Sequence, residues 1–160
     1  MVRAGWLGSL VALSLALILT ALPLPDGLAI ARPAAVPLVL VWLCIHMPSR
    51  FGIVWAWCLG LILDVVHSTS LGQHAVALTL LSYIVIKLRG SLHLLPAWQQ
   101  ALVLIPAWAG YQGLLLWLDG FVGQSIDPLW RWLPVISTSL CWLPLSAIFA
   151  LADRPQHHEA

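Results

Sequence analysis

Asp64 is the only acidic residue that lies well inside an apolar stretch of this sequence. An ionised side chain at the centre of a membrane costs about 2.5–3.5 kcal/mol, so an acid in such a stretch is a candidate for proton transfer or substrate binding. Its predicted helix ends two residues later, at residue 66, which places the carboxylate near the outer interface. A helix C-terminus disfavours negative charge, so a compensating group is expected nearby.

The polar link after this helix contains suitable compensating groups. Backbone N–H groups of residues 68–72, and the positive N-terminus of the following helix, can hydrogen-bond a carboxylate. Gly72 permits the tight turn that these contacts require. We interpret five residues as a structural clasp between the two helices, and we favour this role over proton relay or substrate binding. The predicted clasp consists of Gly60, Asp64, Ser68, Leu71 and Gly72.

Arg32 is a basic residue expected on the same side of the membrane as Asp64. It precedes Pro33, and proline suits the first position of a helix because the N–H it lacks has no helical partner there. The guanidinium of Arg32 has three possible partners: the carboxylate of Asp64, that of Asp26, and a lipid phosphate. Arg32 and Pro33 therefore join the clasp residues as candidates for structural or partner contacts.

Catalytic and metal-binding patterns are missing from the sequence. It contains no G-x-S-x-G, H-E-x-x-H or S-x-x-K pattern and no glycine-rich phosphate loop. None of the six histidines forms a ligand pair on one helix with a nearby carboxylate. The three cysteines include no C-x-x-C pair and lie in apolar stretches, as expected for buried thiols. The sequence therefore predicts no enzyme activity, no cofactor and no metal.

The elements that must position these residues are apolar helices. Apolar residues make up 61% of the 160 residues, 8% are charged, and the mean hydropathy is +0.96. A membrane-spanning helix needs roughly 17–25 mostly apolar residues. The sequence predicts an all-α polytopic membrane protein with one six-helix domain, 1–152, and a cytoplasmic tail, 153–160. The predicted transmembrane helices are 5–22, 33–47, 51–66, 72–87, 97–118 and 129–151, of which the second is the shortest.

Lys and Arg residues predict the orientation, because they are enriched in the cytoplasmic loops of membrane proteins. Six crossings place both termini on one side together with five basic residues, whereas Arg32 and Arg131 fall on the other side. Both termini are therefore expected in the cytoplasm. The net charge of +1 gives no indication of a nucleic-acid partner. The five basic residues are Arg3, Arg50, Lys87, Arg89 and Arg154.

Small residues recur at four-residue spacing on two of the predicted helices. This spacing puts each set on one helix face, where small side chains let two helices approach closely within a bilayer. We expect the two faces to pack against each other or against a helix of a partner. The first face contains Ala4, Gly8, Ala12, Ala16 and Thr20, and the second contains Gly52, Ala56, Gly60 and Asp64.

The stretch from Leu59 to Gly72 has a G-x-x-x-D…S-x-x-L-G pattern that resembles the rod shape-determining protein MreD family. Other motifs agree in order, so that the resemblance covers nearly the whole chain and looks closest to the gammaproteobacterial form. One departure is Ala34, where relatives often carry a polar residue. The other motifs are Pro23-Leu24-Pro25-Asp26, Arg32-Pro33, Met47-Pro48-Ser49-Arg50 and Ala97-Trp98-Gln99-Gln100.

The resemblance implies a non-enzymatic protein of the bacterial inner membrane that takes part in cell elongation. MreD-family proteins accompany the single-pass protein MreC, the actin-like MreB, the glycosyltransferase RodA and its penicillin-binding transpeptidase. The expected function is a scaffold that contacts membrane lipid, binds MreC and helps to position the peptidoglycan synthases. The family is also distantly similar to the six-helix S-components of energy-coupling-factor transporters. The alternative function is therefore that of a vitamin-binding transporter subunit.

Overall fold

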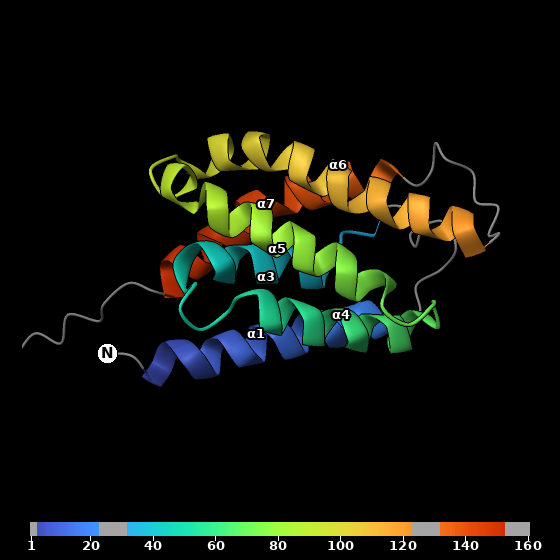
Figure 1. Ribbon diagram of the computed structural model, residues 1–160. Coiled ribbons are helices and arrows are strands. Elements are labelled where there is room, and N and C mark those ends of the chain that lie inside the picture. The colour runs from blue at the N-terminus through green and yellow to red at the C-terminus, as the bar shows by residue number, and fades with distance from the viewer. Residues whose placement is uncertain (1–2, 23–31, 123–131, 153–160) are drawn as a thin grey trace, which may run out of the picture.

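The computed structural model describes residues 3–22, 32–122 and 132–152. In these residues the chain forms six α-helices and no strand, which confirms the predicted all-α fold. Figure 1 shows the helices side by side in one bundle, with α6 and α1 on opposite sides of α3. The helices are α1 (Arg3–Ala21), α3 (Ala35–His46), α4 (Ile53–His67), α5 (Gln73–Leu92), α6 (Ala97–Val122) and α7 (Leu133–Ala152).

The central helix of the bundle is α3. Every residue from Ala35 to Ile45 is buried, and α1, α5 and α7 pack around it. A helix that is apolar on all faces requires neighbours on all sides, and the α3 sequence has this composition. Pro37 lies in the first turn, where backbone N–H groups have no partner within the helix, so it leaves the hydrogen-bond ladder intact.

The helix limits differ from the predicted spans mainly in α5 and α6. α5 continues to Leu92 instead of ending at residue 87, and α6 continues to Val122 instead of ending at residue 118. Lys87 and Arg89 do not end α5, because both are good helix formers and cations are favoured in the last turns of a helix. The start of the last predicted span, at residue 129, lies outside the described residues.

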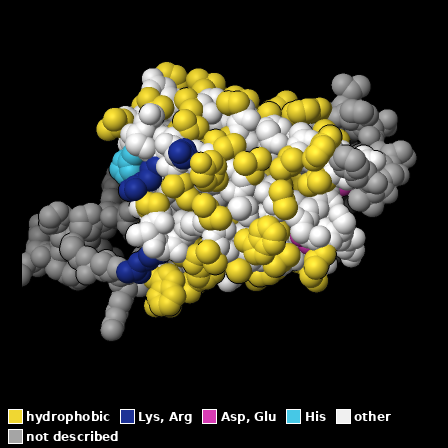
Figure 2. All heavy atoms as spheres, viewed as in Figure 1, with side chains coloured by type: hydrophobic (Ala, Val, Ile, Leu, Met, Phe, Trp, Pro, Cys, Tyr) yellow, Lys and Arg dark blue, Asp and Glu magenta, His cyan; other side chains and the backbone are white. Residues whose placement is uncertain are grey.

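The apolar exterior of the bundle suits a membrane environment. α5 and α6 contain stretches long and apolar enough to cross a membrane, Gln73–Leu92 and Ala97–Gly120, while the apolar stretches of the other four helices are shorter. Large apolar side chains are exposed over much of the visible surface (Figure 2). A water-soluble monomer rarely exposes so much contiguous apolar surface. That all six helices cross the membrane remains a prediction.

The two faces of small residues pack on different neighbours. α1 packs mainly against α3, whereas α4 packs mainly against α5. Ala16 and Ala56 are buried, but Gly8 is exposed, and a Cβ added to it would meet no atom within 4 Å. At Gly60, by contrast, a Cβ would lie 2.2 Å from Cα of Ala75. At Gly60 this face therefore meets α5, while α1 and α4 also contact each other to a smaller extent. The packing of the two faces against each other stays a prediction.

Candidate functional site at the link between α4 and α5

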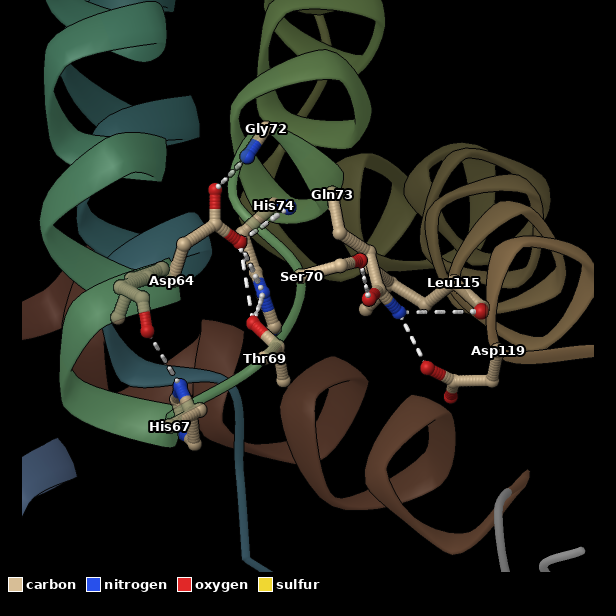
Figure 3. Close-up of polar contacts among 10 residues, drawn as sticks. Asp64, His67, Thr69, Ser70, Gly72, Gln73, His74, Leu115 and Asp119 are labelled. Atoms are coloured by element: carbon tan, nitrogen blue, oxygen red, sulfur yellow. Dashed lines mark hydrogen bonds and ion pairs between the residues drawn. The ribbon is translucent and has the colours of Figure 1, made fainter. Parts of the chain in front are cut away.

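The carboxylate of Asp64 lies at the centre of a polar network where α4 meets α5 (Figure 3). Its Oδ2 accepts a hydrogen bond from the backbone N–H of Gly72 at 2.7 Å, and its Oδ1 accepts one from the backbone N–H of His74 at 2.8 Å. The Nδ1 of His74 and the hydroxyl of Thr69 lie 2.9 and 3.2 Å from Oδ1. Asp64 is only 1% exposed, so hydrogen-bond donors of the protein replace water around it.

Asp64 caps the N-terminus of α5 although it belongs to α4. Gly72 occupies the cap position of α5 but has no side chain that could accept hydrogen bonds from the first N–H groups. The carboxylate of Asp64 accepts from two of these groups, and negative charge is favoured at a helix N-terminus. This contact offsets the unfavourable position of the same charge at the C-terminal end of α4.

Two residues in the left-handed region turn the chain back towards Asp64. Ser68, at the end of α4, has a φ of 52°, and Gly72 has a φ of 101°. The N–H of Ser68 bonds to the carbonyl of Val65, and the N–H of Thr69 bonds to the carbonyl of Asp64, which closes the last turn of α4. A φ of 101° is accessible mainly to glycine, so the position of Gly72 depends on its lack of a side chain.

The rings of His67 and His74 stack beside the carboxylate. Their centroids lie 5.1 Å apart and their planes differ by 11°. Nδ1 of His67 lies 3.1 Å from the carbonyl oxygen of Leu63, which can only accept, so this nitrogen carries a proton. Nδ1 of His74 donates to the carboxylate of Asp64 for the same reason. His74 is buried and His67 is exposed, so His67 is the ring that faces the surroundings.

Gln73 joins the link to α6. Its Nε2 donates hydrogen bonds to the carboxylate of Asp119 and to the carbonyl of Leu115, the latter at 3.4 Å. Its Oε1 accepts a hydrogen bond from the hydroxyl of Ser70 at 3.0 Å. Gln73 is 5% exposed and Asp119 is 4% exposed, so this contact is also buried. Together with Asp64, these bonds tie α4, the link, α5 and α6 to one another.

Gly60 allows α4 and α5 to approach closely one turn away from Asp64. A Cβ at this position would lie 2.2 Å from Cα of Ala75, 2.5 Å from its backbone nitrogen and 2.8 Å from the carbonyl carbon of His74. All three are backbone atoms, which cannot move aside as a flexible side chain does. The reach of the Asp64 carboxylate to the N-terminus of α5 therefore depends on glycine at position 60.

The five clasp residues have different positions at the link. Gly60, Asp64 and Gly72 lie where α4, the link and α5 meet, as described above. Ser68 contributes its backbone conformation, and Leu71 is 79% exposed. Among the described residues, the hydrogen bonds to the Asp64 carboxylate come from Thr69, Gly72 and His74 and not from Ser68 or Leu71.

Neither Arg32 nor Pro33 forms a hydrogen bond or ion pair with the carboxylate of Asp64. The Nη1 of Arg32 donates to the carbonyl of Leu22, just after α1, at 3.0 Å, and no ion pair joins Arg32 to Asp64. Asp26, its other expected partner, is outside the described part of the chain. Pro33 does not begin the helix as predicted, because α3 starts at Ala35. The N–H of Ala34, at the cap position, donates to the hydroxyl of Thr138 on α7, which attaches the start of α3 to that helix.

Four residues of the network were not predicted from the sequence: Thr69, Gln73, His74 and Asp119. Gln73 and His74 form the first turn of α5. They are polar residues directly before an apolar stretch, and this is the sequence feature that could have indicated their role. Asp119 directly follows the predicted helix 97–118 and was not assigned a contact. Its contact with Gln73 joins residues 46 positions apart, and local spacing carries no information about such a pair.

The hydrogen bonds of the Asp64 network suit it to holding α4, the link and α5 in position. Both oxygens of Asp64 accept hydrogen bonds from the link or from α5. Within the described ranges, no group of three or more His, Cys, Asp or Glu side chains could hold a metal ion. The network therefore orders the link, and the residues that it leaves exposed are available for contacts with other molecules.

Comparison with known proteins places the whole helical bundle in one family. Residues 3–151 match the family model for the rod shape-determining protein MreD. The rod shape-determining protein MreD of Haemophilus influenzae is 33% identical over 91 residues, which are 57% of this chain and 56% of that relative. The match thus spans little more than half of that relative. No solved structure matches the chain. Because the family model extends from the first helix to the last, the chain belongs to the MreD family of rod shape-determining proteins.

Proposed function

We propose that this MreD-family protein is a non-enzymatic scaffold of the bacterial cell-elongation complex. It crosses the inner membrane six times, binds MreC through the outer end of the bundle, and helps to position the peptidoglycan synthases together with MreB. The family assignment supports a role in rod shape. The observation that carries the proposed contact is the exposed side chain of Leu71, on a link that the buried Asp64 network holds in place.

Leu71 has the properties of an anchor for a partner protein. Its side chain is 79% exposed on a polar link, and Val65 on the last turn of α4 is 70% exposed. Both flanking positions are held, because Ser70 bonds to Gln73 and Gly72 bonds to Asp64. A side chain on such an ordered segment loses little conformational entropy on binding, which favours affinity.

The distribution of charge supports an orientation with the link on the outer side. Three described cations, Arg50, Lys87 and Arg89, lie at the end of the helices opposite to the link, whereas Arg32 lies just before α3. Lys and Arg residues favour the cytoplasmic side, so the larger number supports this orientation. In this orientation both termini lie in the cytoplasm and the link between α4 and α5 faces the periplasm. A single-pass partner with an outer segment, such as MreC, can reach Leu71 there.

Co-purification of MreC tests the proposed contact. The variant Leu71→Ser should retain at least about fivefold less MreC than wild type in neutral detergent, equivalent to a loss of about 1 kcal/mol. Leu94→Ser is the matched control, because Leu94 is 86% exposed but follows α5 at the other end of the bundle. Cells that carry only Leu71→Ser should lose rod shape. Equal MreC retention by Leu71→Ser and wild type would contradict the contact.

The same purified protein distinguishes the scaffold from a vitamin-binding transporter subunit. A transporter subunit should show a higher Tm when its vitamin is added, whereas a scaffold should show no change with any of the B vitamins. The network at the outer end favours the scaffold, since the buried side chains of Gln73 and Asp119 bond to each other. A vitamin-dependent rise in Tm without retention of MreC would replace the scaffold proposal.

A further inference from the structure

The described carboxylates and most of the described cations lie at opposite ends of the bundle. The carboxylates in the described part of the chain belong to Asp64 and Asp119, near the link. Figure 2 shows Lys, Arg and His side chains gathered at the other end. We call this the basic end and define it by Arg50, Lys87 and Arg89. No described carboxylate lies there to neutralise these three cations.

Arg89 is fixed at this end with most of its hydrogen-bonding capacity unused. Its Nε donates to the carbonyl of Ile45 at 2.9 Å, which attaches α5 to the last turn of α3. Neither terminal NH₂ group of the guanidinium has a hydrogen-bond acceptor among the described residues. The side chain is half-buried, so its position is defined while it remains accessible. An ordered guanidinium with two free NH₂ groups suits the oxygens of a phosphate.

Further cationic or ionisable groups lie at the same end of the bundle as this guanidinium. Lys87 lies two residues before Arg89 and holds its ammonium 5.5 Å from the ring centroid of Tyr83. His93 follows Arg89 by one turn, is exposed, and lies 5.6 Å from the ring of His46 between their centroids. Arg50 is exposed on the turn that follows α3, the helix whose carbonyl holds Arg89. These groups thus lie at the end of the bundle where α3 and α5 both finish.

An apolar surface begins directly beside these cations. Leu80, Ile84 and Leu88 are exposed on α5 at 48%, 37% and 41%, and they lead from Lys87 towards the middle of the helix. In a membrane the acyl chains of lipids cover this surface, so a lipid headgroup is the ligand nearest to the adjoining cations. A phospholipid can contact both the cations and the apolar surface, because its phosphate can meet the cations while its acyl chains lie along α5.

We propose that the basic end binds the headgroup of an anionic phospholipid, with Arg89 as the fixed contact and Lys87 and Arg50 as additional cations. Each cation near an anionic lipid surface contributes about fivefold in affinity, equivalent to about 1 kcal/mol. The proposal uses the membrane location of the protein but not the contact of Leu71 with MreC. It therefore stands or fails independently of that contact.

Native mass spectrometry of the full chain in neutral detergent tests this proposal. With equal amounts of phosphatidylglycerol and phosphatidylcholine, the protein should retain at least about fivefold more phosphatidylglycerol, and phosphatidylglycerol should raise its Tm. Inorganic phosphate at the same concentration should not raise the Tm. Equal retention of the two lipids would overturn the proposal. An equal effect of inorganic phosphate would identify a soluble anion as the ligand, and binding of an acidic peptide in preference to the lipid would identify a protein partner.

Charge-removing variants locate the site. Arg89→Gln and Lys87→Gln should each lower phosphatidylglycerol retention about fivefold, whereas Arg32→Gln, which removes a cation elsewhere, should not. If Arg89→Gln fails to fold without its bond to Ile45, Lys87→Gln and Arg50→Gln carry the test, because both side chains are exposed. This site would be excluded if Lys87→Gln and Arg50→Gln retained as much phosphatidylglycerol as wild type. It would also be excluded if Arg32→Gln reduced the retention equally. Leu71→Ser should retain the lipid like wild type, which separates this result from the MreC experiment.

Discussion

The two ends of the bundle differ in the burial and hydrogen bonding of their charged side chains. Near the link between α4 and α5, Asp64 and Asp119 are buried, and donors of the protein surround them. At the basic end, Arg50 and Lys87 are exposed, and Arg89 uses one of its N–H groups on the protein. A buried charge is tolerated only when fixed hydrogen bonds replace its water. An exposed cation instead remains available for a ligand.

This difference indicates which contacts maintain the fold and which serve binding. The buried network connects three helices through the link, so changes there should alter stability first and partner binding second. The basic end contributes few contacts inside the bundle, so changes there should alter lipid retention with little loss of stability. Four substitutions test this distinction, and they follow from the largest expected effect on stability to the smallest.

Gly60→Leu should have the largest effect on the buried end. Its Cβ alone would overlap the backbone of Ala75, and overpacking costs about 1–3 kcal/mol or more. We expect loss of the folded protein from detergent extracts, measured by size-exclusion profile and protease resistance. Gly8→Leu is the matched control, since nothing lies within 4 Å of its Cβ position, and it should behave like wild type. Similar behaviour of the two variants would refute the close approach of α4 and α5.

Asp64→Ala should destabilise the link strongly while leaving the helices present. It removes the acceptor for the N–H groups of Gly72 and His74, and buried donors without acceptors cost about 1–3 kcal/mol each. Cleavage by an added protease should begin in residues 68–72, and MreC retention should fall. Asp64→Asn keeps one acceptor oxygen, so its resistance to the protease should lie between that of Asp64→Ala and that of wild type. Equal protection of Asp64→Ala and wild type would mean that the cap contributes little.

Gln73→Leu should have a moderate effect, because it removes the bond between α5 and α6 and leaves the carboxylate of Asp119 without this donor. We expect a loss of about 1–3 kcal/mol in an unfolding titration with sodium dodecyl sulfate. Gln99→Leu, a change of the same type in the first turn of α6, should cost less. If the two variants unfold at the same detergent fraction, the contact between Gln73 and Asp119 does not stabilise the bundle.

Lys87→Gln should have the smallest effect on stability. Its contact with Tyr83 is exposed, and such a cation–π contact contributes about 0.5–1 kcal/mol. The midpoint of the same unfolding titration should therefore move little, whereas phosphatidylglycerol retention should fall. A loss of stability as large as that of Gln73→Leu would show that the basic end also maintains the fold, and the contrast between the two ends would disappear.

The helical architecture follows closely from the sequence, whereas the limits of individual helices follow less closely. Apolar stretches located all six helices, because each apolar helix needs an apolar environment whatever its neighbours are. The limits are less certain, as α5 shows by continuing beyond its predicted end at residue 87, through Arg89 to Leu92. Long basic side chains can reach polar surroundings from a continuing helix, so their charge does not require the helix to stop.

The sequence by itself determined that Asp64 needs a partner near the end of its helix, because the helix dipole and burial both act locally. It also indicated that Gly72 would form part of the turn. Only the tertiary structure decided that His74 and Thr69 complete the site, that Gln73 meets Asp119, and that Gly60 packs against Ala75. These contacts depend on how helices cross, and crossing is set by the packing of whole surfaces that residue spacing along the chain does not encode.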